Sequence, residues 1–257
     1  PEVITTGFSP DLSLGINRGA VHASTYLSSR LQGMGSYLST TTTAAENSDT
    51  ASVLSMDGIT INSGNLTSGF GGGQTYVGEF FKRAPSFMDV VCYTGTGATG
   101  NAIAHNLTVA PELAIFKGRS GLLGTNDWQV IANFTAANYI KMVLNTANAA
   151  LGPYTYAINA GIAAVPTAET ITVDNVANFN NGSSNYVLYL FATLAGVSKV
   201  GSYTGTAASL DLDMGFTGGA RFFLCKRTDA TGDWYTYDSS RGIVAGNDPY
   251  LLLNSTA

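Results

Sequence analysis

Three glycines near the middle of the chain have the spacing of a nucleotide-binding loop. Gly95, Gly97 and Gly100 follow an apolar run and fit the pattern G-x-G-x-x-G, which lets a backbone turn tightly and approach a pyrophosphate at the start of a helix. No amphipathic helix pattern follows Gly100, and a related segment at 203–210, YTGTAASL, keeps only the first glycine. A dinucleotide site needs a strand-helix-strand crossover, so the sequence predicts a turn between two strands instead.

Two Asp-Trp pairs are the best candidates for a binding site. In Asp127-Trp128 and Asp233-Trp234, the latter followed by Tyr235, an aromatic ring that can stack on a sugar stands beside a carboxylate that can accept hydrogen bonds from hydroxyls. In an architectural interpretation, the Trp fills the core and the Asp caps a hairpin. Recurrence fits both interpretations. We favour the architectural one and keep these five residues as candidates for contact with a glycan or a receptor.

Residues that could catalyse a reaction are sparse. Glycoside hydrolysis needs two carboxylates about 5–10 Å apart, and of the glutamates only Glu2 and Glu112 recur, each after a proline at the expected start of a strand. His22 and His105 have no Ser or Asp at a spacing that indicates a triad, so a solvated or core histidine is the better interpretation of both. We therefore expect no enzymatic activity.

Metal-binding patterns are equally weak. Cys92 and Cys225 are far apart, and neither has a second Cys or His at ligand spacing, so we expect buried or half-buried free thiols. Asp211 and Asp213 alternate with apolar residues, which two outward positions of one strand explain, and no loop of the EF-hand type follows them. The sequence predicts no metal and no cofactor.

Composition and charge exclude some partners. Charged residues make up 11% of the chain, against about 25% in typical soluble domains. The net charge is −5 and no basic block appears, which argues against nucleic acid as a partner. The longest apolar run, residues 186–197, is shorter than the roughly 20 residues of a membrane span. The chain opens with Pro1 and no leader pattern, so we expect an excerpt or a processed product.

Self-similarity divides the chain into copies of one module. Residues 75–96, TYVGEFFKRAPSFMDVVCYTGT, match residues 185–206, NYVLYLFATLAGVSKVGSYTGT, at a constant offset of 110. The match continues where Pro111-Glu112 corresponds to Pro1-Glu2, Lys117 to Lys226, and Leu144-Asn145 to Leu253-Asn254. Fixed periods indicate repeat architectures. We predict a partial module at 1–87 that lacks its start, a complete one at 88–197 and a partial one at 198–257 that lacks its second half.

Each copy has the pattern of short strands. Apolar runs at 111–116 and 186–191 are rich in β-branched and aromatic residues, and residues 140–145 alternate with a period of two. Helix is conceivable at 136–144, but the counterpart segment contains Pro249, which favours a strand. Gly and Asn turn signals recur every 8–12 residues or so. The expected fold is all-β, with tandem, jelly-roll-like β-sandwich modules of about 110 residues.

Several matched segments resemble a repeat module of virion and tail-fibre-like proteins of tailed bacteriophages, particularly those of marine bacteria and cyanobacteria. They are FMDVVCYTGTG at 87–97, HNL at 105–107 ahead of PEL at 111–113, GVSKVGSYTGT at 196–206, GDW at 232–234 and YLLLN at 250–254. The resemblance covers nearly the whole chain. It is weakest at 11–30, where Leu12 stands in place of the Trp of the Asp-Trp pair. This departure argues against an essential role for the Trp of that pair.

The resemblance implies a place in a phage particle and brings no catalytic residues. It implies a tail fibre or another surface appendage, with other virion proteins and further copies of the chain, as a homotrimer, among its partners. Three hypotheses follow: a structural protein that contacts host surface polysaccharide or protein, a purely architectural or decoration protein without a ligand, and, as the least favoured, a glycan depolymerase.

Overall fold

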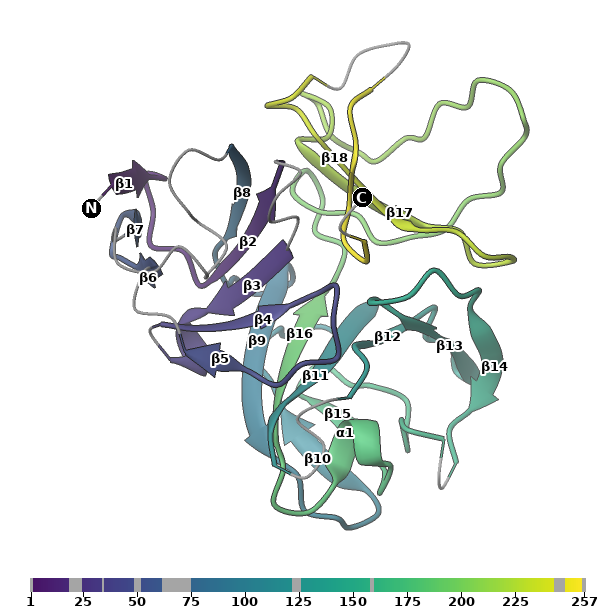
Figure 1. The fold of residues 1–257 in the computed structure, drawn as a ribbon. Coiled ribbons are helices and arrows are strands. Elements are labelled where there is room, and N and C mark those ends of the chain that lie inside the picture. The colour runs from purple at the N-terminus through teal and green to yellow at the C-terminus, as the bar shows by residue number, and fades with distance from the viewer. Residues whose placement is uncertain are drawn as a thin grey trace.

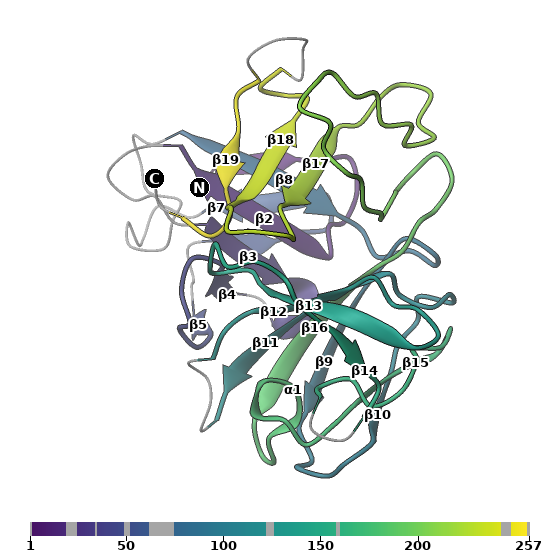
Figure 2. The same ribbon diagram turned by 90° about the vertical axis from the view of Figure 1, so that its right-hand side faces the viewer.

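Strands make up almost all regular structure in this computed structural model, which describes residues 2–18, 25–33, 35–48, 52–61, 75–121, 126–157, 160–242 and 248–255. The short apolar and alternating runs form the strands, and Gly and Asn turns separate them. Within these ranges three larger sheets meet around a common centre (Figures 1 and 2). The all-β sandwich expectation is confirmed.

The first sheet is formed by residues 12–81 and has the order β5-β4-β3-β2-β8. Its strands are β2 (Leu12–Asn17), β3 (Thr25–Ser29), β4 (Ser36–Ser39), β5 (Asn47–Ser48) and β8 (Tyr76–Phe81). The short 3-10 helix η1 (Arg30–Gln32) connects β3 to β4. A small sheet beside it has the order β1-β7-β6 and consists of β1 (Glu2–Thr5), β6 (Ser52–Leu54) and β7 (Gly58–Ile61).

The second sheet is formed by residues 88–191, has the order β14-β13-β12-β11-β16-β9 and carries a second layer. Its strands are β9 (Met88–Thr94), β11 (Leu113–Ser120), β12 (Gln129–Ala132), β13 (Asn138–Val143), β14 (Leu151–Thr155) and β16 (Asn185–Phe191). The second layer is the pair β10 (Asn101–Ala104) and β15 (Thr170–Val173) with the helix α1 (Ala177–Asn180). Apolar side chains of both layers share one buried cluster, as in a sandwich.

The third sheet is formed by residues 222–252 and has the order β17-β18-β19. Its strands are β17 (Phe222–Lys226), β18 (Trp234–Asp238) and β19 (Leu251–Leu252). The preceding residues, 199–221, form a long coil beside it (Figure 1). The strand expected at Asp211 and Asp213 is therefore wrong, because this segment pairs with no strand in the described residues.

The central core joins the three sheets. Along β16 the side chains alternate: Val187 and Tyr189 face the central core, and Leu188 faces the second layer. The first sheet contributes Leu12, Leu14, Ile16 and Leu38, the second adds Val130 and Met142 with the adjoining Trp128 and Leu144, and the third adds Trp234 with the adjoining Leu253. Each sheet lies within one of the modules predicted from the sequence, whose boundaries and tandem arrangement stay predictions.

The glycine-rich stretch joins β9 to β10, as the turn interpretation expects. A side chain at Gly95 would place its Cβ 2.1 Å from the carbonyl oxygen of Asn181, so only glycine fits at this close approach. Gly97 and Gly100 have φ angles of 68° and 74°, in the left-handed region that favours glycine. The prediction of a turn between two strands is confirmed.

Candidate functional site

The first Asp-Trp pair is held by an asparagine from the next turn. The side-chain amide of Asn145 donates to the carboxylate of Asp127 at 2.9 Å, and its Oδ1 accepts from the backbone N–H of Trp128 at 2.9 Å. The carboxylate thus orients an amide that caps the start of β12. The hydrogen bond that the Asp127 carboxylate accepts therefore comes from within the protein rather than from a ligand.

The second pair makes the same contacts. Asn254 donates to Asp233 at 2.8 Å and accepts from the backbone N–H of Trp234 at 2.8 Å. Leu253 then donates its N–H to the Trp234 carbonyl at 3.0 Å. The two sites are copies in geometry as well as in sequence.

Both Trp side chains are covered and each contacts the preceding sheet. Trp128 is 0% exposed and Trp234 is 3% exposed. The Trp128 indole N–H donates to the Ser39 carbonyl of the first sheet at 2.9 Å, and the Trp234 indole donates to the Val143 carbonyl of the second at 3.0 Å. Trp128 also stacks on Tyr189 with ring centroids 6.4 Å apart. Neither indole presents a free face on which a sugar could stack.

A lysine accompanies each Trp and contacts a loop between two strands of the preceding sheet. The Lys117 ammonium donates to the Thr43 carbonyl at 2.9 Å and to the Asn126 carbonyl at 2.6 Å. Lys226 contacts the Ala147 carbonyl at 3.3 Å and that of Gly232 at 2.7 Å. These carbonyls take the place of water around a charge that is costly to bury.

Burial changes the chemistry of the more enclosed lysine. Lys117 is fully buried, whereas Lys226 is half-buried. Desolvation lowers the pKa of Lys117 to about 8, against the opposing effect of the Asp127 carboxylate. Its hydrogen bonds to carbonyl oxygens account for its position without a substrate.

Tyr235 lies on the outer face of the third sheet, away from the buried Trp. Its ring is 5.1 Å from that of Tyr250, and Tyr237 lies 6.3 Å from the same ring. Phe223 is opposite Tyr237 in the strand register, with ring centroids 6.1 Å apart. Tyr250 is 52% exposed. We call Phe223, Tyr235, Tyr237 and Tyr250 the aromatic face. Of the five candidate residues, only Tyr235 belongs to it.

The sequence comparison missed Tyr237 and Tyr250 as members of this face. The alternation W-Y-T-Y-D along β18 carries a signal for Tyr237, because every second residue of a strand points to the same side. Tyr250 lies in another segment, just before β19, so only the fold brings it beside Tyr235.

In the first sheet, Leu12 is not the residue that corresponds to Trp128. Leu12 pairs with Phe81 across β2 and β8, and Leu113 pairs with Phe191 across β11 and β16 in the same way. Leu12 therefore matches Leu113, and the expectation that it replaces the Trp is wrong.

Thr25 occupies the position that corresponds to the Trp. Its carbonyl accepts the N–H of Thr40 at 3.0 Å, as the Trp128 carbonyl accepts the N–H of Leu144 at 3.0 Å. Thr25 is buried. Position 24, which would correspond to the Asp, lies outside the described residues.

The recurrent glutamate has a structural role. Glu112 accepts the backbone N–H of Thr193 at 2.5 Å, and Asp11 accepts that of Arg83 at 2.9 Å at the corresponding place in the first sheet. Asp11 therefore has the position that the sequence comparison gave to Glu2. Both carboxylates cap the chain just after a strand ends.

The remaining candidates for chemistry do not form a site. His105 is buried and its Nε2 has no hydrogen-bond partner in the described part of the chain, in agreement with a core histidine. His22 lies outside the described residues. Cys92 and Cys225 are half-buried free thiols, as expected, and burial raises the pKa of both. Within the described ranges, no three His, Cys, Asp or Glu side chains gather in a way that could hold a metal ion.

One acidic group lies between the first and third sheets. Burial raises the pKa of Glu79 on β8 to about 7; the nearby Asp238 carboxylate adds to this rise and the Arg241 guanidinium opposes it. Asp238 and Arg241 form a buried ion pair. This arrangement makes the contact between the two sheets sensitive to pH.

The comparisons with known proteins identify a family. A family model described as "Domain of unknown function (DUF7483)" matches residues 81–256, more than half of the chain. The chain belongs to this family. The DUF7483 match begins at the last residue of β8 and includes the second and third sheets, so it crosses the boundary expected between 197 and 198. No curated protein and no solved structure gives a significant match. No helix in the described residues is long and apolar enough to cross a membrane.

Proposed function

We propose that this chain is a structural component of a phage particle, in a tail fibre or another surface appendage, and that it contributes to attachment to the host surface. The observation that carries the architectural part is the repeated contact between sheets. Trp128 bonds to a carbonyl of β4 and Lys117 to a carbonyl in the loop after β4. Trp234 and Lys226 make the matched bonds to β13 and to the loop after it. Such nearest-neighbour contacts are the means by which repeat proteins extend.

The composition supports a role on a particle surface. Few charges and many Thr, Asn, Ser and Gly residues give a surface hydrated by hydroxyl and amide groups. In an appendage, further copies of the chain and other virion proteins would cover the outer strands of its sheets. The proposed assembly is a homotrimer, by analogy with fibres.

The aromatic face supports the attachment part. Tyr235, Tyr237 and Tyr250 bring their rings together on one side of the third sheet. Tyrosines of this kind can pack against the C–H face of a sugar ring and bond to its hydroxyls at little entropic cost. The ligand class is therefore a host surface polysaccharide or glycosylated protein.

Binding to host cell envelopes tests the attachment part. We expect the protein to bind an envelope fraction or an arrayed surface glycan at micromolar concentration. A double variant, Tyr235→Ala with Tyr250→Ala, should bind at least tenfold more weakly with an unchanged melting temperature. Tyr203→Ala is the matched control, because Tyr203 is 53% exposed and lies in the coil. If the unaltered protein binds no envelope fraction, the attachment role is wrong.

A purely architectural or decoration protein is the second candidate. The observation that favours it is the burial of both Trp side chains, which removes them from a ligand surface. A glycan depolymerase is the least favoured, since Asp127 and Asp233 hold asparagines and Glu112 caps a strand. An appendage that assembles normally but binds no host material would support the architectural candidate.

A further inference from the structure

The third sheet has an open edge where the other two sheets have a strand. β2 of the first sheet pairs with β8, and β11 of the second sheet pairs with β16. β17 pairs with β18 on one side, and on the other side no strand in the described residues pairs with it. An unpaired edge presents a row of backbone N–H and C=O groups that can accept another strand.

β17 corresponds to β11 residue by residue. β11 is hydrogen-bonded to β12 and β17 to β18, the strands that follow Asp127 and Asp233, and Lys226 corresponds to Lys117. Four of the five matched residues are buried in β11, but all five are only partly buried in β17. Among the described residues, no strand lies beside β17 as β16 lies beside β11.

The strands that occupy the two matched edges share a sequence pattern. β8 reads YVGEFF, and residues 186–191 of β16 read YVLYLF, so both contain Tyr-Val-x-x-x-Phe. In both, the final Phe lies opposite the first residue of the accepting strand, at Leu12 and Leu113. The same register would place the Phe of an incoming strand opposite Phe222.

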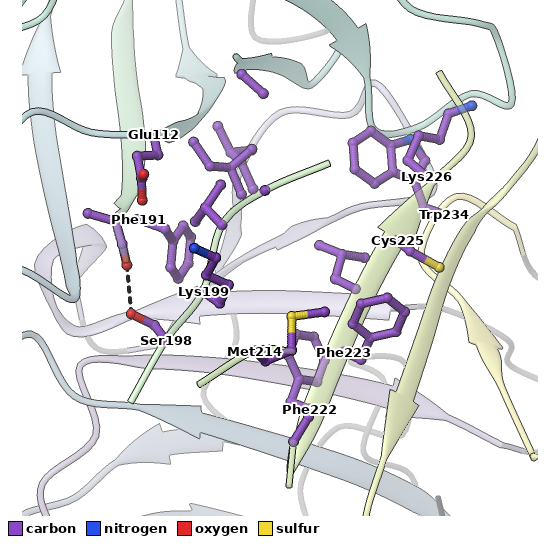
Figure 3. A pocket seen from close by; sticks show the side chains of 18 of the residues that line it. Glu112, Phe191, Ser198, Lys199, Met214, Phe222, Phe223, Cys225, Lys226 and Trp234 are labelled. Carbon is purple, nitrogen blue, oxygen red and sulfur yellow. Dashed lines mark hydrogen bonds between the residues drawn. The ribbon is translucent and has the colours of Figure 1, made fainter. Parts of the chain in front are cut away.

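The space for such a strand is present. An open groove of about 2400 Å³ is lined by Phe81, Phe191 and Phe222 among others, and Figure 3 shows side chains of β17 and of the preceding coil around it. Phe81 contacts Phe191 at 6.4 Å and Phe222 at 5.8 Å between ring centroids. A third phenylalanine from an incoming strand would join this group.

We propose that the open edge of β17 accepts an extended polypeptide strand with the pattern Tyr-Val-x-x-x-Phe, in antiparallel orientation. The backbone of β17 supplies the hydrogen bonds, and the groove beside Phe81 and Phe191 selects the Phe that ends the pattern. This inference does not depend on the virion role, since any protein with such a strand would fit.

Binding of a peptide with the β16 sequence tests the proposal. Residues 185–193, NYVLYLFAT, are synthesised and titrated against the whole chain. We expect saturable binding. We also expect at least tenfold slower hydrogen exchange of the amides of Phe222, Leu224 and Lys226, which point away from β18. A matched peptide with Pro in place of the Val should not bind, because proline removes a ladder N–H and fits poorly within a strand.

Cross-linking tests the register. Cys225 corresponds to Phe116, which pairs with Leu188. In a Cys92→Ser background and with oxidised glutathione as the oxidant, a peptide with Cys at the position of Leu188 should form a disulfide with Cys225, because directly opposite side chains are close enough. A peptide with Cys one residue later, at the position of Tyr189, points to the other face and should not.

Three results would overturn the proposal. The first is the absence of peptide binding, and the second is equal cross-linking by the two cysteine peptides. The third is slow exchange, without peptide, of the amides of Phe222, Leu224 and Lys226, which point away from β18, whether or not it depends on protein concentration. Slow exchange of that kind would mean that the coil or a second copy of the chain already covers the edge.

Discussion

At the scale of single residues, the side chains that looked most suited to binding hold the sheets together. Trp234 and Trp128 are buried, and their indole N–H groups bond to the second and the first sheet, respectively. Their carboxylate neighbours each orient an asparagine. Recurrence of these residues therefore reflects a repeated structural contact.

Replacement of Trp234 tests this interpretation. Trp234→Ala should lower the free energy of unfolding by about 3–5 kcal/mol, because it removes a large buried side chain and leaves a cavity. Envelope binding per folded molecule should not change. Denaturant titration gives the stability, with Tyr203→Ala as the exposed control. A small loss of stability together with abolished binding would contradict the architectural role.

The two lysines offer a matched comparison. Lys117→Ala leaves the buried Asn126 carbonyl without its lysine donor, and an orphaned buried group costs about 1–3 kcal/mol. It also removes the bond to the carbonyl of Thr43, which is an exposed residue. Lys226→Ala removes the same contacts at a half-buried site, where water can replace them. Denaturant unfolding should therefore show a clearly larger loss for Lys117→Ala. Equal losses would mean that the burial of Lys117 is unimportant.

At the scale of elements, the carboxyl group of Glu79 on β8, near Asp238 of β18, has a raised pKa. The pKa of Glu79 is about 7 in the folded protein, above its ordinary value of 4.5. The folded state therefore binds this proton more tightly, and stability that is fully present below about pH 4.5 is lost as the pH rises through about 7. Asp238 and Arg241 are the charged groups beside it.

Substitution of Glu79 isolates this effect. The glutamine of the Glu79→Gln variant cannot ionise. The free energy of unfolding of this variant should therefore fall less than that of the unaltered protein between pH 4.5 and 7.5. Urea unfolding at several pH values gives both curves, and their difference removes the contribution of the other groups. Parallel curves would contradict the raised pKa.

The strand pattern could be predicted from sequence where side chains alternate, as in β13 and β16. The Asp-Trp pairs were found because both copies keep their side chains. The first sheet was misaligned at Leu12, since Asp11-Leu12 resembles an Asp-Trp pair while Thr25, at the true position, keeps only a backbone hydrogen bond. The aromatic face depends on Tyr250, which folding brings beside Tyr235, and no local pattern indicates that contact.

At the scale of the whole molecule, the three sheets share one core and are linked in a closed set of contacts. The second sheet bonds to the first through Trp128, and the third bonds to the second through Trp234. Thr40, next to the first sheet, donates to the Leu253 carbonyl of the third at 2.7 Å. Sheets joined in this way should unfold together.

Single-tryptophan variants test that cooperativity. Trp128→Phe leaves Trp234 as a probe of the third sheet, and Trp234→Phe leaves Trp128 as a probe of the second. In each variant, unfolding followed by fluorescence and by circular dichroism should have the same midpoint. Separate transitions would show that the sheets fold as independent domains.

The central claim is that the chain belongs to the surface of a phage particle. Virions purified from a host lysate are examined by mass spectrometry and, with an antibody against residues 81–256, by immunogold electron microscopy. The account predicts peptides of this chain in the purified particles and gold at a tail or another surface appendage. Particles that lack the chain, or that carry it only inside the capsid, would contradict the account.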